Sequence, residues 1–564
     1  MGDSSSKYSK LDEVQQRVEA KSGKIMVSGR YRRLPNRIED DYDFPQENRV
    51  VLGTGYNGAV FQARSKKDKS LKYAVKAFHL RGVDKAQKQL LETEVEIFLS
   101  MDHPQICRLV GVYECDNLLN LVMECMEGGE LFNRVLEKKY FAEKDAAHAT
   151  WQMLLAVAYL HGKGIVHRDL KLENFLYENK DSDHLKLIDF GFSHIWDPNT
   201  TMASSCGTLS YLAPEVLGGK YTSQCDLWSL GVIVFILLVG YMPFAGNEKD
   251  QLDRIKKGKY HWKMEKWKRV SPGAEDFVKK LLTVNPMDRL TTDQALAHPF
   301  IKNHENAKQE QSEDHSQATA DALLSYANAS HFRRAALSLM AWSLTNEERA
   351  KVRNCFLKID TTNSGKITLG DLKQVLQSNL EVEDDHVQHI FDALDTSNTE
   401  EINYTEFLAA MVSTRINMHD ELLAKTFARF DVDNTGFISK ENLQVVLGDT
   451  FHGKDIDELI ASADKEKTGK ISYQDFMHYL KNQHQEEGID NVADQLIDAQ
   501  IKKETTADGT LPAVEEGFAP TYMRCTTKVL RQSQEEQVRT QVAEEAAATG
   551  SPPPAEKSQC CAIS

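Results

Sequence analysis

The sequence lacks a long apolar run, paired cysteines and an excess of positive charge, and each absence excludes a class of protein. The most apolar run, residues 230–240, is far shorter than the ~20 residues that a membrane-spanning helix needs, so we interpret it as a buried helix. The nine cysteines are scattered without metal-ligand spacing, which favours reduced thiols in the cytoplasm. The formal net charge of -16 argues against nucleic acid as a partner.

Length and composition predict a soluble chain with several folded parts. At 564 residues it is too long for one hydrophobic core, and 41% hydrophobic with 27% charged residues is typical of soluble globular proteins. Strand-like segments precede long helical patterns after residue 43, which indicates an α+β fold with two lobes. We divide the chain into a flexible extension at 1–43, a two-lobed domain at 44–300, a linker with an amphipathic helix at 301–345, repeated units at 346–482 and a mobile tail at 483–564.

A glycine-rich segment, LGTGYNGAVFQA, opens the two-lobed domain. Its glycines, Gly53, Gly55 and Gly58, lie between apparent strands and allow backbone N–H groups to approach nucleotide phosphates closely. A glycine pattern alone also fits a simple β-turn. The next charged residues favour the phosphate site, because Lys76 of YAVKAF can neutralise the α- and β-phosphates and Glu94 is its expected partner.

Two further segments supply the remaining groups that phosphoryl transfer requires. In HRDLKLEN, Asp169 can accept the proton of a substrate hydroxyl and Lys171 can stabilise the transferring phosphoryl group. Asn174 in the same segment and Asp189 of DFG offer oxygen ligands for Mg²⁺. Anionic oxygens for the metal and cations for the phosphates are therefore both present.

The segments GTGYNGAV, AVK, HRDLKLEN, DFG and APE occur in the order and spacing of protein kinases, and residues 44–300 resemble that family throughout. The resemblance implies a bilobal kinase fold that binds ATP and Mg²⁺. It also implies that the nucleotide lies among the glycine-rich loop, Lys76, Asn174, Asp189 and these further positions: Leu52, Val60, Ala74, Met123, Glu124, Met126 and Glu130.

The resemblance extends to specificity and to architecture. Lys171 after HRDL resembles serine/threonine rather than tyrosine kinases, and Glu130 and Glu173 match acidic positions that favour basic substrates. Architectural roles follow for three residues: Asp226 bracing the catalytic segment, and Glu215 paired with Arg289. Four hydroxyls are either phosphorylation sites or part of an unmodified loop: Thr200, Thr201, Ser204 and Ser205.

A second pattern repeats four times in the C-terminal half. Acidic loops start at Asp360, Asp395, Asp431 and Asp464, separated by 35, 36 and 33 residues, and each lies between two amphipathic helices. An EF-hand loop presents oxygens at positions 1, 3, 5, 7, 9 and 12, with glycine at 6 and an apolar residue at 8. Isoleucine stands at position 8 in all four loops, so four EF-hand units are predicted.

The candidate Ca²⁺ ligands are unequal from loop to loop. They are Asp360, Thr362, Ser364, Lys366 and Asp371 in loop 1; Asp395, Ser397, Thr399 and Glu406 in loop 2; Asp431, Asp433, Thr435 and Phe437 in loop 3; and Asp464, Glu466, Thr468, Lys470 and Asp475 in loop 4. Aspartate shortens position 12 in loops 1 and 4, Glu400 occupies the glycine position of loop 2, and Asn442 replaces the carboxylate of loop 3. Each loop is therefore either a calcium site or a helix–loop–helix that packs without metal.

The segment between the two halves, SHFRRAALSLMAWSLTNEE, predicts a basic amphipathic helix from Phe332 to Leu344. Grooves of calmodulin type accept such helices. A helix of this kind between a kinase and EF-hands resembles the junction of the calcium-dependent protein kinases of plants and protists, over residues 44–481. The resemblance implies that this junction helix blocks the substrate site at low calcium, with Arg333 and Arg334 near the acidic positions, and is captured by the EF-hands when calcium binds. An ordinary connecting helix is the alternative.

The chain ends in CCAIS, which fits a prenylation pattern at Cys561, with Cys560 placed for palmitoylation; an unmodified tail is the alternative. Gly2 meets the bare myristoylation pattern, although acidic Asp3 follows it. We expect a cytoplasmic protein that two lipids could anchor to a membrane.

The sequence as a whole predicts a calcium-regulated serine/threonine protein kinase with protein substrates. Two alternatives remain at this stage. One is a calcium-binding scaffold with an inactive kinase domain, which the presence of Lys76, Asp169, Asn174 and Asp189 disfavours. The other is a lipid-anchored kinase that is largely insensitive to calcium.

Overall fold

The computed structural model describes most of the unit that spans Met1–Glu486. The residues described are 9–28, 30–33, 36–45, 49–55, 58–80, 85–115, 118–191, 193–195, 202, 208–309, 316–379, 384–415, 420–465 and 467–482. Within these ranges no helix is long and apolar enough to cross a membrane. The tail at 483–564 lies outside them, as do Gly2 and the hydroxyls at 200, 201, 204 and 205.

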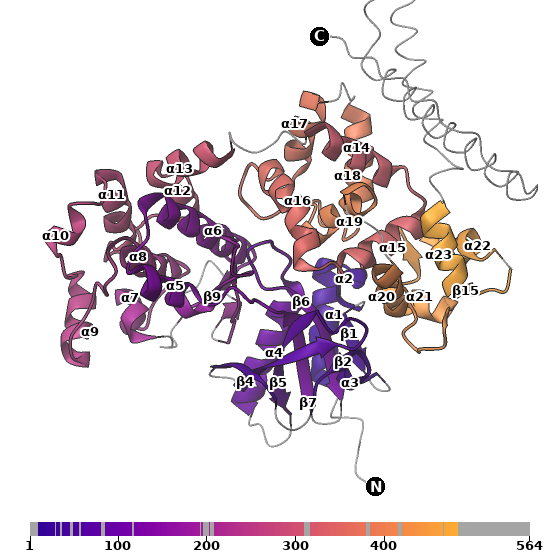
Figure 1. Cartoon of the computed structure of the whole chain (residues 1–564), viewed down its shortest axis with the longest axis horizontal. Helices are drawn as coiled ribbons and strands as arrows, with labels where there is room; N and C mark the ends of the chain where they lie inside the picture. The colour runs from indigo at the N-terminus through magenta and orange to yellow at the C-terminus, as the bar shows by residue number, and fades with distance from the viewer. Residues whose placement is uncertain are drawn as a thin grey trace, which may run out of the picture. The chain divides into compact units, whose positions relative to one another are not determined.

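A seven-stranded sheet forms the first lobe of the domain (Figure 1). Its order is β1-β6-β7-β5-β4-β2, with β3 also paired to β4; β1 runs parallel to β6 and the other pairs are antiparallel. The strands are β1 (Tyr31–Arg33), β2 (Tyr42–Asp43), β3 (Val51–Gly55), β4 (Gly58–Ser65), β5 (Lys72–His79), β6 (Leu109–Cys115) and β7 (Leu118–Glu124). The register sets Val60 opposite Lys76, so the strand after the glycine-rich turn lies beside the candidate phosphate-binding lysine.

Helices build the second lobe around α8 (Gln224–Val239), which is buried over its whole length from Cys225. This confirms the buried helix predicted for the most apolar run, and Gly240 ends it with φ of 77°. The other helices of the lobe are α5 (Leu131–Lys138), α6 (Glu143–Gly162), α7 (Pro214–Leu217), α9 (Glu248–Lys257), α10 (Met264–Trp267), α11 (Pro272–Leu281), α12 (Thr292–Leu296) and α13 (Pro299–Gln309). Short pieces beside them are β8 (Ile165–Val166), η1 (Leu172–Asn174), β9 (Phe175–Tyr177), β10 (Leu185–Leu187), β11 (His194–Ile195) and η2 (Leu209–Tyr211).

The C-terminal half contains four helix–loop–helix units in two pairs. Position 8 joins the loops of each pair: Ile367 and Ile402 exchange backbone hydrogen bonds of 2.9 Å, and Ile438 lies opposite Ile471. This pairing confirms the EF-hand fold predicted from the isoleucines. The elements are α16 (Asn346–Ile359), α17 (Leu369–Asn379), α18 (Asp384–Leu394), α19 (Tyr404–Arg415), α20 (Asp420–Phe430), β12 (Phe437–Ile438), α21 (Lys440–Leu447), β13 (Thr450–Phe451), β14 (Lys454–Asp455), α22 (Ile456–Ala463), β15 (Ile471–Ser472) and α23 (Tyr473–Asn482).

The junction forms α15 (His331–Ala341), preceded by α14 (Ser316–Ala327). Every residue of α15 from Phe332 onward is buried, and the helix packs against α19, α20 and α22. The Phe332 ring contacts the rings of Phe430, Phe476 and Tyr479, and Arg333 donates to the carbonyl of Leu480 at 2.9 Å. The EF-hands therefore enclose the junction helix in this structure.

The described residues between 9 and 43 correct the expectation of a flexible extension at 1–43. They form α1 (Ser9–Ser22), α2 (Lys24–Ser28), β1, α3 (Ile38–Asp41) and β2. Val14 and Val18 are each 1% exposed. Two apolar residues four positions apart do not predict an amphipathic helix in a polar sequence. They are enough to form a buried face when another helix covers them. The expected linker is likewise helical, since α13 continues to Gln309 and buries Ile301.

Gly231 tests the close packing of α8 against α11. A Cβ built on Gly231 would lie 2.8 Å from Cβ of Leu281, whereas a Cβ on Gly162, at the end of α6, would have no atom within 4 Å. Gly→Ala in a helix normally stabilises by up to about 1 kcal/mol, but overpacking costs about 1–3 kcal/mol. We expect Gly231→Ala to lower the melting temperature of the kinase domain and Gly162→Ala to leave it equal or higher. A Gly231→Ala protein that melts at or above the wild-type temperature would contradict this packing.

Candidate active site and calcium-binding loops

Lys76 occupies a buried position between two carboxylates. Its Nζ lies 2.5 Å from Oε1 of Glu94, on α4 (Lys85–Ser100), and 3.1 Å from Oδ1 of Asp189. Lys76 is 4% exposed; burial alone would lower its pKa, but the two carboxylates reverse that effect and raise it. A fixed ammonium at this position can bind nucleotide phosphates, and the structure brings together the three residues that the sequence placed in one site.

Apolar packing fixes the two segments that carry these carboxylates. Phe98, one turn after Glu94 on α4, meets the ring of Phe190 edge to face with centroids 5.0 Å apart. Phe190 follows Asp189 directly and also contacts His167, at 5.8 Å between centroids. The position of α4 and the position of Asp189 are therefore coupled through one buried ring.

The catalytic segment gathers around Asp169. Lys171 Nζ lies 2.6 Å from Oδ2 of Asp169, and Asn174 Nδ2 donates to the Asp169 carbonyl at 2.7 Å. The Asn174 carbonyl accepts from the amide of Ile188, at 3.1 Å, so Asn174 lies beside the segment that bears Asp189. A carboxylate paired with an ammonium, next to amide and carboxylate oxygens, is chemically suited to proton acceptance beside a divalent cation.

Thr208 is a contact that the sequence did not reveal. Its amide and its hydroxyl both donate to Oδ1 of Asp169 at 2.8 Å, and its Oγ1 lies 3.5 Å from Nζ of Lys171. Only its position after the DFG segment distinguishes it from other threonines. It holds the Asp169 carboxylate in one orientation.

Two architectural interactions expected from the kinase resemblance are confirmed. Oδ2 and Oδ1 of Asp226 accept the amides of His167 and Arg168, each at 2.9 Å, which holds Arg168 at φ of 70°. Arg289 donates to both carboxylate oxygens of Glu215, at 2.6 and 3.0 Å. Asp226 thus braces the catalytic segment, while Arg289 joins Glu215 to the start of α8 through the Gln224 carbonyl, at 2.6 Å.

Three of the residues expected around the nucleotide lie on neighbouring strands. Ala74 on β5 lies opposite Met123 on β7, and Val60 lies on β4; Met123 is buried while Ala74 and Val60 are half-buried. Met126 and Glu130 follow β7 and are half-buried, whereas Leu52 on β3 is exposed. Burial, and then the charge of Glu173 in η1, raise the pKa of Glu130, which precedes α5.

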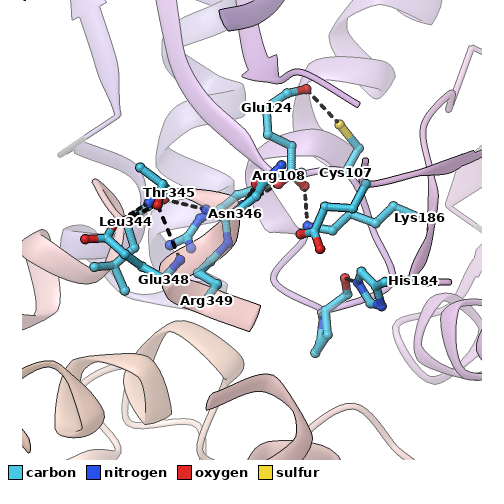
Figure 2. A network of polar contacts seen from close by, with 12 residues as sticks. Cys107, Arg108, Glu124, His184, Lys186, Leu344, Thr345, Asn346, Glu348 and Arg349 are labelled. Atoms are coloured by element: carbon cyan, nitrogen blue, oxygen red, sulfur yellow. Dashed lines mark hydrogen bonds and ion pairs between the residues drawn. The ribbon is translucent and has the colours of Figure 1, made fainter. Parts of the chain in front are cut away.

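The Glu124 side chain belongs to a network of polar contacts that was not predicted from the sequence (Figure 2). Its carboxylate pairs with Lys186 of β10 at 2.7 Å and with Arg349 of α16, and it accepts the amide of Arg108 at 2.7 Å. Burial would raise the pKa of Glu124, but the charges of Lys186 and Arg349 lower it to about 2. A residue of the predicted nucleotide site is thus bound directly to the first EF-hand helix.

Further contacts join the first EF-hand pair to the kinase domain. Asp102 accepts both the amide and the hydroxyl of Thr405 at 2.7 Å, at the start of α19. Gly365 in loop 1 has φ of 78°, and a Cβ there would lie 2.4 Å from the His103 ring. Glycine at position 6 therefore allows both the loop conformation and the close approach to the kinase domain.

Loops 1 and 2 bury the carboxylates expected to hold calcium. Burial raises the pKa of Asp360 to about 6 and that of Glu406 to about 7. Asp371 is also buried and further raises the pKa of Asp360. Buried carboxylates are costly unless a cation offsets their charge, so the donor set fits Ca²⁺. Glu400 adopts φ of 60°, the left-handed conformation that its place in loop 2 predicted.

Among the described residues, loop 3 buries one carboxylate, that of Asp431, whereas loop 4 buries two, those of Asp464 and Asp475. Asp431 and Asp433 lie together in loop 3, where Oδ1 of Asn442 accepts the amide of Ser439 at 3.2 Å. In loop 4, Asp475 accepts the equivalent amide of Ser472 at 3.1 Å. Glu466 lies outside the described residues. Over the part of the chain that is described, no group of three or more Asp, Glu, His or Cys side chains forms a metal cluster, so hydroxyl and carbonyl oxygens would have to complete each set.

Two family models match the chain: the protein kinase domain over residues 46–301, and the EF-hand domain pair over 349–412 and 420–481. The site and fold therefore define a protein kinase followed by an EF-hand domain. Among curated proteins, Calcium-dependent protein kinase 34 of Arabidopsis thaliana is 35% identical over 437 residues, 76% of this chain and 83% of the relative. Calcium-dependent protein kinase 5 of Plasmodium falciparum (isolate 3D7) is 32% identical over 448 residues, 78% of each.

The chain belongs to the calcium-dependent protein kinase family. It is a calcium-regulated serine/threonine protein kinase that binds ATP and acts on protein substrates. The family, fold class and enzyme class predicted from the sequence are confirmed, and the comparisons support neither alternative.

Arg349 provides a test of the network around Glu124. Arg349→Leu keeps an apolar stem but leaves the Glu124 carboxylate with one charged partner, and breaking a buried ion pair typically costs about 3–5 kcal/mol. We expect the melting temperature of the full chain to fall by several degrees. Lys351→Leu, at an exposed position of the same helix, is the matched control and should stay near the wild-type value. Equal melting temperatures for the two variants would refute the stabilising role of Arg349.

Proposed function

We propose that the chain transfers the γ-phosphoryl group of ATP to serine or threonine in basic sequence contexts, and that calcium relieves inhibition by the junction helix. The observation that carries this proposal is the convergence of Lys76, Glu94, Asp189 and Asp169 with the captured junction helix in the same chain. Electrostatic positioning supplies most of the catalysis in phosphoryl transfer, so such a convergence is the main requirement.

In this proposal each group of the site has one task. Asp169 accepts the proton of the substrate hydroxyl, held by Thr208, while Lys171 stabilises the transferring group. Lys76, fixed by Glu94, binds the α- and β-phosphates. Asn174 and Asp189 would hold Mg²⁺, which supplies charge neutralisation at the phosphate oxygens when bound.

The preference for basic substrates follows from Glu130 and Glu173. The raised pKa of Glu130 reflects burial together with the charge of Glu173, so a cationic substrate side chain would relieve the repulsion between the two. The same site would accept the arginines of the junction helix. Substrate and inhibitor would then compete for one acidic surface.

Charge reversal tests this preference. We expect Glu130→Lys to raise KM for a basic peptide about ten-fold and to leave kcat within two-fold, because the interaction concerns substrate binding. Glu137→Lys, at an exposed position of α5, should match the wild type. Steady-state kinetics with a basic and a neutral peptide provide the measurement, and a KM that is unchanged for both peptides would count against an acidic substrate site.

The switch depends on two exclusive positions for one helix. In this structure Arg333 and Arg334 are buried within the EF-hand half, so they are not available to Glu130 and Glu173. At low calcium we propose the alternative position, in which the helix occupies the substrate site. Calcium shifts the population because only calcium-loaded EF-hands bury Phe332 and its apolar neighbours.

Phosphate transfer by the full chain tests the proposed switch. With a basic peptide we expect at least ten-fold higher activity with calcium than with a chelator, and no calcium response for Phe332→Asp, which prevents capture. Asn328→Asp, at an exposed position just before α15, serves as the control, and Asp169→Asn gives the background. Equal activity of the wild type in both conditions would overturn calcium relief, and no transfer would overturn the catalytic assignment.

Lipid attachment is a separate proposal about a part of the chain outside the described residues. A prenyl group on Cys561 and a palmitoyl group on Cys560 would together anchor a cytoplasmic kinase to a membrane, because one chain alone binds only marginally. The mass of the intact protein from its own cell decides this, since an unmodified mass would exclude both lipids.

A further inference from the structure

Helix α1 packs against α4, the helix that carries Glu94. Val14 and Val18 of α1 belong to the same buried core as Val95 of α4. Beside them, Arg17 donates to Oε2 of Glu96 through Nη2 at 2.7 Å and through Nε at 3.2 Å. The N-terminal segment thus contacts α4 within one turn of the residue that fixes Lys76.

The same segment then reaches the end of α4 and the junction. Arg30 is 1% exposed and donates to the carbonyl of Leu99, the second-to-last residue of α4, at 2.7 Å. Its guanidinium lies 3.9 Å from the ring centroid of Trp342, which follows α15 directly. Arg108 stacks on the same ring at 4.2 Å. A single indole therefore joins the N-terminal segment, the kinase sheet and the captured junction helix.

A third set of contacts lies in calcium loop 3. Asn36 Nδ2 donates to the carbonyl of Val432 at 3.0 Å, and Asn434 Nδ2 donates to Oδ1 of Asn36 at 2.6 Å. Val432 and Asn434 alternate with Asp431 and Asp433, the candidate ligands of that loop. Asn36 is consequently within hydrogen-bond reach of backbone and side chain in the loop that would close around Ca²⁺.

We propose that the described residues 9–28, 30–33 and 36, here named the N-terminal clasp, join calcium loop 3 to helix α4 and so position Glu94 against Lys76 when the EF-hands are loaded. Arg17, Arg30 and Asn36 are its positioning residues. The proposal rests on the calcium relief proposed above and adds a direct route from one loop to the active site. The clasp favours the arrangement in which α4, Trp342 and loop 3 lie within its reach, and contacts present in one state alone can shift a population.

Coupling between two sites acts in both directions, so the clasp must also affect calcium binding. If calcium at loop 3 favours the clasped arrangement, then the clasp must raise the calcium affinity of loop 3 by the same factor. A clasp that only stabilised the fold would change the melting temperature. It would not selectively change the kinetics or the calcium concentration for half-maximal activity. A positioning role and a purely stabilising role therefore predict different results.

The contact with α4 is tested by charge exchange in the full chain. We expect Arg17→Glu and Glu96→Arg each to lower kcat/KM for ATP about three- to five-fold at saturating calcium, and the double variant to recover to within two-fold of the wild type. Gln16→Ala, at an exposed position of α1, is the control. Wild-type kinetics in both single variants, or a double variant no better than the singles, would overturn the positioning role. The melting temperature of each variant separates unfolding from mispositioning.

The contact with loop 3 is tested by calcium titration of the same kinase activity. We expect Asn36→Ala to raise the calcium concentration for half-maximal activity about three- to ten-fold, the effect of losing one or two hydrogen bonds, and to leave kcat at saturating calcium unchanged. In an Asp431→Ala background the same substitution should have no effect on the midpoint. An unchanged midpoint in the single variant, or an equal shift in both backgrounds, would overturn the route through loop 3. A wild type without any calcium response would instead refute the proposed switch, while the charge exchange still reports on α4.

Discussion

The structure depends on one buried cation, Lys76, held between Glu94 and Asp189. Each of the three comes from a different part of the domain: β5, α4 and the segment after β10. Burying an ammonium costs free energy unless carboxylates pair with it. Movement of any one of the three segments would therefore break an ion pair of Lys76. The Phe98–Phe190 contact adds apolar packing to the same junction. Any element that moves α4 therefore acts on the phosphate-binding lysine.

Much of this architecture could be predicted because local chemistry determines it. The glycine-rich turn, the catalytic segment and the isoleucines at position 8 are short patterns in which backbone geometry or charge permits few residues. Lys76, Asp169, Asn174 and Asp189 meet as their spacing indicated, and Ile367 pairs with Ile402. Glu400 likewise adopts the positive φ that its place in the loop demanded.

The contacts that escaped prediction are those between distant segments. Val14 and Val18 look like isolated valines in a polar extension, and only the surface of α4 explains their burial. Glu124 was expected only beside the nucleotide, while its carboxylate pairs with Arg349, 225 residues further along the chain. Thr208 and Trp342 have no local pattern that distinguishes them. A contact between distant segments leaves no pattern within a short stretch of sequence, so hydrophobic periodicity cannot predict it.

Strand β1 has a consequence for the behaviour of the chain in solution. It pairs in parallel with β6, from Tyr31 opposite Val112 to Arg33 opposite Glu114, and so occupies one margin of the seven-stranded sheet. Without it, β6 would present unpaired N–H and C=O groups, and bare strand margins of this kind recruit strands from other molecules. The three residues of β1 form a shorter margin than the seven of β6, and very short edge strands recruit other strands less readily. A protein shortened past Arg33 would expose the longer margin and would be more prone to aggregate even where its catalytic residues were intact.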